Sequence, residues 1–173
     1  AVNNNLGNAY RELGQYDNAL EHFQQAQTLA AAMDSSILQA RILNNIASLH
    51  VVFGDFTAAD LAIDEAFSLI DEPTQSEWTR FLWGARAEIA YGRGDYRIAR
   101  DYIGRTFDGV SLETTTQSFA EFHEAAANIY QALTEWSQAV PHLRAFKRLD
   151  DEGREVAVSA NSALLGAEFD FAE

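Results

Sequence analysis

The four histidines are the residues best suited to acid–base or metal chemistry, because imidazole titrates near neutral pH and ligates metal ions. They are His22, His50, His123 and His142, and they fall in four different predicted helices. None belongs to an HExxH pattern, which would place two imidazoles on one helical face beside a catalytic glutamate. The chain also has no cysteine, which excludes thiol nucleophiles, disulfides and cysteine zinc sites. We therefore predict no metal site and no cofactor.

The other chemically suggestive residues also lack a catalytic pattern. Residues 91–95 (YGRGD) contain two glycines, but no strand is predicted before them and they lack the lysine of a phosphate-binding loop. With 26 acidic residues in the chain, carboxylate pairs arise by chance, so Glu12, Glu88 and Glu124 carry no signature of general acid–base catalysis. We expect a protein that is not an enzyme.

The charge and hydropathy of the chain exclude two classes of partner. There are 26 acidic against 12 basic residues, a net charge of -14, whereas binding to nucleic acid requires clustered Lys and Arg. No apolar run approaches the roughly 18 residues of a membrane-spanning helix, and no signal peptide is visible. We expect a cytoplasmic protein with no nucleic-acid or membrane partner. Because the chain opens at Ala1 inside a predicted helix, we also expect it to be a fragment of a longer protein.

The elements that position these residues repeat at a constant offset of 40 residues. Each unit has a turn residue, an aromatic residue two positions later and a small residue three positions after that: Gly14, Tyr16 and Ala19, then Gly54, Phe56 and Ala59, then Gly94, Tyr96 and Ala99, then Thr134, Trp136 and Ala139. Apolar residues on either side follow helical spacing, so each unit is predicted to be a helical hairpin. A fixed period of this size indicates a solenoid, in which each unit buries its apolar face on the next.

The first unit resembles the tetratricopeptide repeat in both residue types and spacing. The matching residues are Leu6, Gly7, Tyr10, Gly14, Tyr16, Ala19, Phe23 and Ala26. The resemblance implies an all-α fold, a right-handed superhelical α-solenoid of about four helical hairpins plus a C-terminal helix. The expected repeats are about 1–33, 34–72, 73–110 and 111–149. Their 40-residue spacing, against about 34 in the common form, implies longer helices, as in the extended bacterial variants of the family.

In this family the first helix of each unit lines a concave groove, which implies a binding site for a peptide or protein segment. Carboxamides there would hold an extended backbone, because each offers a donor and an acceptor. Trp78, Phe81 and Tyr91 would select side chains around a hollow at Gly84 and Ala85, with Glu88 available to a cation. The implied groove residues are Asn4, Asn5, Asn8, Arg11, Arg41, Asn44, Asn45, Ser48, Trp78, Phe81, Glu88, Tyr91 and Asn128.

The predicted last helix, residues 150–173, leaves two functions open. Val158, Leu165 and Phe169 share an apolar seam, which would either cap the solenoid or pair with a second copy through Leu165 and Phe169. The segment also resembles the end of repeat arrays in bacterial signalling proteins, where the final helix connects to an output domain. The main hypothesis is therefore a protein-binding scaffold. The alternative is a sensory and dimerising module of a signalling protein such as a diguanylate cyclase or a transcription regulator.

Overall fold

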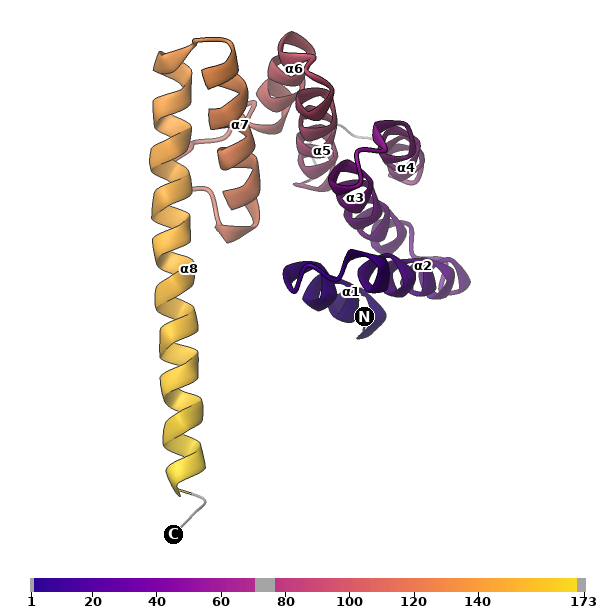
Figure 1. Cartoon of the computed structure of the whole chain (residues 1–173), viewed down its shortest axis with the longest axis vertical. Coiled ribbons are helices and arrows are strands. Elements are labelled where there is room, and N and C mark those ends of the chain that lie inside the picture. Colours follow the sequence, from indigo (N-terminus) through magenta and orange to yellow (C-terminus); the bar gives the residue numbers. More distant parts are fainter. Residues whose placement is uncertain (1, 71–76, 171–173) are drawn as a thin grey trace. The chain divides into compact units, whose positions relative to one another are not determined.

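The structure is a computed structural model that describes residues 2–70 and 77–170, with side chains described through residue 159. This described part is helical, with no strand, which confirms the all-α prediction (Figure 1). The helices are α1 (Val2–Glu12), α2 (Tyr16–Ala32), α3 (Ser36–Val52), α4 (Phe56–Ser68), α5 (Glu77–Arg93), α6 (Tyr96–Thr106), a short 3-10 helix η1 (Gln117–Phe119), α7 (Ala120–Ala132) and α8 (Trp136–Asp170). No helix in these described ranges combines the length and apolar content that crossing a bilayer requires.

The chain divides into two compact units, residues 1–108 (unit 1) and 109–173 (unit 2). Unit 1 consists of three helical hairpins, in which α1 packs on α2, α3 on α4, and α5 on α6. Successive hairpins stack because α2 contacts α3 and α4 contacts α5, while α3 also lies against α1 and α5. The first helices of the three hairpins therefore form one continuous face of the unit.

The turn inside each hairpin requires a left-handed backbone. Gly14, Gly54 and Gly94 have φ values of 71°, 73° and 88°, which other residues adopt only with strain. Thr134 occupies the equivalent turn of unit 2 with a φ of 60°, so the repeat geometry persists without the glycine. The side chain of Asp55 caps the next helix, since its Oδ1 accepts from the backbone N–H of Ala58 at 3.0 Å. The expected turns are confirmed.

A close approach of α1 to α2 explains why a glycine lies inside α1. A Cβ at Gly7 would lie 3.0 Å from Cζ of Phe23 and closer still to two other ring atoms. Phe23 has no exposed surface, so its ring cannot move aside without disturbing the core.

We predict that Gly7→Ala lowers the free energy of unfolding by about 1–3 kcal/mol, measured by urea denaturation. Gly104→Ala is the matched control, because nothing lies near the added methyl and alanine favours the helix. Equal effects of the two substitutions would contradict the close approach.

Unit 2 is one long hairpin preceded by a loop. α7 packs along the first part of α8, and η1 contacts both helices (Figure 1). We expected a helix soon after residue 111, but residues 109–116 form a loop and α7 begins only at Ala120. We also expected separate helices on either side of residue 150, whereas α8 runs for 35 residues without a break. Ion pairs one turn apart, such as Arg148 with Glu152 at 3.0 Å, support the helix through that boundary.

Candidate functional site

Polar side chains on the first helices of the first two hairpins in unit 1 meet across α1 and α3. Asn45 Nδ2 on α3 donates to Asn4 Oδ1 on α1 at 3.1 Å, and Arg11 Nη1 donates to Ser48 Oγ at 3.4 Å. Asn4 is almost fully buried, although it is polar. The structure therefore brings together residues separated by about one repeat. We call the polar face formed by Asn4, Asn8, Arg11, Arg41, Asn44, Asn45, Ser48 and Trp78 the α1–α3–α5 face.

Two carboxamide oxygens of this face are buried without a hydrogen-bond partner in the described part of the chain. They are Oδ1 of Asn8 on α1 and Oδ1 of Asn44 on α3. A buried polar atom without a partner costs about 1–3 kcal/mol, so such atoms are rare in stable folds. These two acceptors are therefore left unpaired within the described part of the chain.

The aromatic end of the face differs from the sequence-based expectation. The guanidinium of Arg41 lies over the Trp78 ring, 5.1 Å from its centroid, which links α3 to α5. Phe81, expected to select side chains, is only 9% exposed and packs 5.2 Å from Trp78, measured between ring centroids. Gly84 and Ala85 are buried as well. The hollow expected at these two residues stays a prediction. Trp78 is partly exposed at this end of the face.

The remaining predicted residues have varied environments. Asn5 is exposed on α1, Glu88 is half-buried on α5, and Tyr91 lies at the end of α5 with its ring 5.4 Å from that of Tyr96. Asn128 is exposed on α7, in unit 2. The side chains of Leu165 and Phe169, the predicted self-association residues, lie outside the described ones.

Sequence reasoning missed a buried polar cluster in unit 2. The Nδ1 atoms of His123 on α7 and His142 on α8 are 2.9 Å apart, and both residues are at least 95% buried. His123 Nε2 lies 2.8 Å from Oγ1 of Thr115, in the loop before η1. Arg148 on α8 donates to the same loop, at 3.0 Å from the Thr115 carbonyl oxygen. The sequence analysis placed the histidines in different helices and predicted no contact between them.

The electrostatics of this cluster favour neutral histidines. Burial, together with the smaller effects of the neighbouring His142 and Arg148, lowers the pKa of His123 to about 4. Burial alone lowers the pKa of His142 to about 4. Both imidazoles are therefore uncharged at neutral pH. No group of three or more potential metal ligands occurs among the described residues, so the pair lacks the ligand set of a structural metal site.

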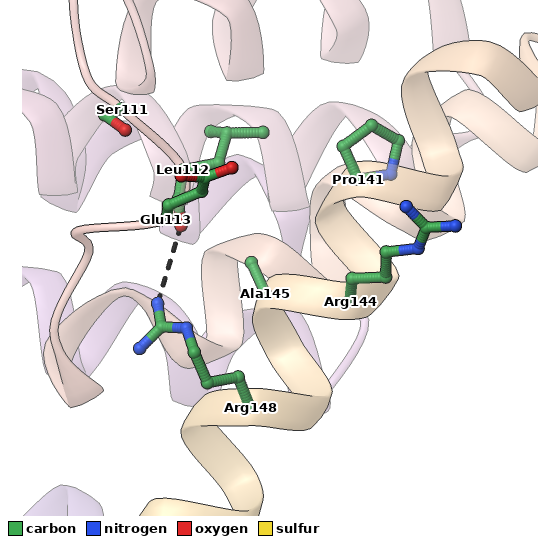
Figure 2. A pocket seen from close by; sticks show the side chains of 7 residues that line it. All are labelled: Ser111, Leu112, Glu113, Pro141, Arg144, Ala145 and Arg148. Carbon is green, nitrogen blue, oxygen red and sulfur yellow. Dashed lines mark hydrogen bonds between the residues drawn. The ribbon is translucent and has the colours of Figure 1, made fainter.

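A hollow of about 680 Å³ lies beside this cluster, between the loop and one face of α8. Figure 2 shows Arg148 reaching to the backbone of Leu112, which fixes the loop as one wall of the hollow. Arg144, one turn earlier on α8, points away from the loop (Figure 2). The residues lining the hollow are Ser111, Leu112, Glu113, Pro141, Arg144, Ala145 and Arg148.

Comparison with known families identifies the repeats. The tetratricopeptide repeat family matches residues 1–72, the segment that supplies α1–α4 and most of the polar face. Residues 1–72 therefore match the tetratricopeptide repeat. This confirms the resemblance found in the first unit of the sequence. No curated protein sequence matches the chain.

A solved structure supports the tetratricopeptide-like solenoid over more of the chain. It is described as BtubC (BKLC) from P. vanneervenii, and it superposes with a TM-score of 0.64 at 18% sequence identity. The match covers 88% of this chain but 63% of the other, so this chain spans less than two thirds of that protein. At this identity the likeness shows the fold alone.

Proposed function

We propose that this tetratricopeptide repeat chain binds an extended segment of another protein on its α1–α3–α5 face. Tetratricopeptide repeats are generally protein–protein interaction modules, which sets the class of function. The face offers the chemistry that an extended backbone needs, because carboxamides both donate and accept hydrogen bonds. It acts as a largely preformed scaffold and performs no catalysis.

The unpartnered oxygens of Asn8 and Asn44 carry this proposal. An extended chain has free N–H groups, which can donate to these acceptors when the two carboxamides turn toward the ligand. The two oxygens have already lost their water when the chain folds. A hydrogen bond to either oxygen therefore stabilises the complex more than a bond to a solvated group does. Every peptide has backbone N–H donors, so these hydrogen bonds do not distinguish one sequence from another. Selection among peptide side chains therefore rests on Trp78 and Arg41 at the edge of the face.

Selection from a random peptide library against the chain tests the proposal. We expect enriched peptides that compete with one another for a single site and no longer bind when Asn8 and Asn44 are changed. Peptides that bind the variant equally well would place the site elsewhere. A library that yields no binder would argue against the function itself.

A second function, self-association through α8, is favoured by one observation. α8 continues to Asp170, whereas α7 covers only its first part (Figure 1). Beyond α7 the side chains of Val156 and Val158 are 70% and 65% exposed. A helix that extends past its partner with exposed apolar residues suits pairing with a second copy. This chain would then work as the dimerising connector of a larger signalling protein.

Light scattering distinguishes pairing of α8 with a second copy from capping of the solenoid by α8. If α8 pairs, we expect the molar mass of a dimer, and we expect Leu165→Asp with Phe169→Asp to halve it by placing charges in the apolar seam. The matched control is Ser159→Asp with Glu155→Gln, which keeps the net charge and changes only exposed positions. A monomeric mass for the unaltered chain would leave α8 as a cap.

A further inference from the structure

The hydrogen bonds of the unit 2 cluster fit two neutral histidines. In one consistent arrangement the hydroxyl of Thr115 donates to the carbonyl oxygen of Leu112, 3.0 Å away. Oγ1 of Thr115 must then accept from Nε2–H of His123. With its proton on Nε2, neutral His123 presents a bare Nδ1, which accepts from Nδ1–H of His142. Each ring therefore carries one proton, and every donor faces an acceptor.

This arrangement has no place for an additional proton. A proton on Nδ1 of His123 would face Nδ1–H of His142 across 2.9 Å, which turns a hydrogen bond into a repulsive contact. A proton on the other nitrogen of His142 would keep that bond but create a buried cation, since His142 is only 5% exposed. Either added proton costs less free energy once the imidazole rings are exposed to water.

The charged and titratable groups around the pair reinforce this preference. On α8, Arg148 places its guanidinium beside Thr115, 3.3 Å from Oγ1, so a positive charge is already present. On α7, the ring of Tyr130 stacks on His142 with centroids 5.7 Å apart. Glu152 neutralises Arg148 from the solvent side at 3.0 Å. From the loop, the hydroxyl of Thr115 contacts His123.

We propose that Thr115, His123, His142 and Arg148 form an acid-operated latch that holds the loop 109–116 against α7 and α8 and releases it when the histidines take up protons. The helical hairpin stays folded on release, because its contact also contains buried apolar residues outside the latch. These are Ala126, Ala127, Ile129, Ala139, Ala145 and Leu149. Release removes one wall of the hollow, since Ser111, Leu112 and Glu113 belong to the loop. This inference is independent of the proposed function of unit 1.

The sign and size of the effect follow from proton linkage. Both histidines have a lowered pKa in the held state, about 4 against the ordinary 6.5, so the released state binds more protons between these values. The latch is fully closed above pH 6.5 and weakens as the pH falls toward 4. One such histidine raises the ratio of released to held loop about 100-fold between pH 7 and pH 4. Two histidines raise it further.

A spin label on the loop measures the release directly. The chain has no cysteine, so Glu113→Cys creates a single site for the label. We expect an immobilised spectrum at pH 7 and a mobile one near pH 4, while circular dichroism shows that the helices remain. The matched control is Gln138→Cys, an exposed position on α8, whose label should keep the same mobility. A loop label that stays immobile at pH 4, or moves only when the helices unfold, would overturn the latch.

Two further measurements assign the effect to the histidines. In His123→Gln with His142→Gln, label mobility should no longer change with pH, whether or not the loop is already loose at pH 7. A persisting acid transition would assign the release to carboxylates and contradict the proposal. In the unaltered chain, NMR titration should give His123 and His142 midpoints well below the ordinary 6.5. Midpoints near 6.5 for both residues would also contradict it.

Discussion

Phe23→Ala is expected to lower the free energy of unfolding of unit 1 by about 3–5 kcal/mol. The ring has no exposed surface and fills the space between α1 and α2 over Gly7. Its removal leaves a cavity that the rigid hairpin cannot close, so packing is lost as well as hydrophobic burial. Chemical denaturation followed by circular dichroism measures the change. Phe53→Ala is the control, because Phe53 is 44% exposed and should cost much less.

A double variant tests whether the cost arises from the contact with Gly7. Gly7→Ala clashes with the Phe23 ring, so it should be harmless once that ring is absent. The effects of Gly7→Ala and Phe23→Ala should therefore be far from additive, with a coupling of about 1–3 kcal/mol. Additive effects would show that the two residues act independently and that the close approach is not what requires glycine.

Asn8→Ala combined with Asn44→Ala is expected to weaken peptide binding about 10- to 100-fold, since each lost hydrogen bond contributes about 0.5–1.5 kcal/mol. The same change should leave the stability of the free chain unchanged or raise it. Both oxygens are buried without a partner in the described chain, and alanine has the higher helix propensity. Calorimetry with a selected peptide measures the change in affinity, and urea denaturation measures the change in the free energy of unfolding.

The control for this variant is Asn18→Ala on α2. Asn18 is exposed and its Nδ2 donates only locally, to Gln15 Oε1 at 3.0 Å. The substitution should leave the dissociation constant of the peptide unchanged. If the double variant lost stability and affinity together, the two asparagines would have a structural role and the proposed contacts would be wrong.

Much of the fold could be predicted because local constraints set it. Gly14, Gly54 and Gly94 mark turns that need a left-handed backbone, and their 40-residue spacing gave the hairpins of unit 1. The long loop before α7 was not foreseen, because residues 111–116 contain no proline or glycine to mark it. The continuity of α8 was not predicted, because aspartate often begins a helix and Asp150 therefore suggested a new one. In the structure Asp150 is instead one member of a row of ion pairs along α8.

The candidate sites were predictable only where repeat spacing was applied to side chains. The α1–α3–α5 face followed from the positions of the asparagines, but burial of Phe81 depends on packing between hairpins. The histidine pair carried a signal that went unused. His123 and His142 stand 40 residues after Trp83 and Tyr102, whose rings stack with centroids 5.5 Å apart. Equivalent positions in successive repeats make equivalent contacts, so the histidines should have been expected to meet.

NMR mapping of a selected peptide tests the central claim most directly. Binding should shift the backbone signals of α1, α3 and α5 and the side-chain amide signals of Asn8 and Asn44. The signals of α2, α4 and α6, the second helices of the same hairpins, should change little. Shifts concentrated on those second helices, or confined to residues 109–173, would contradict the account and place the binding surface elsewhere.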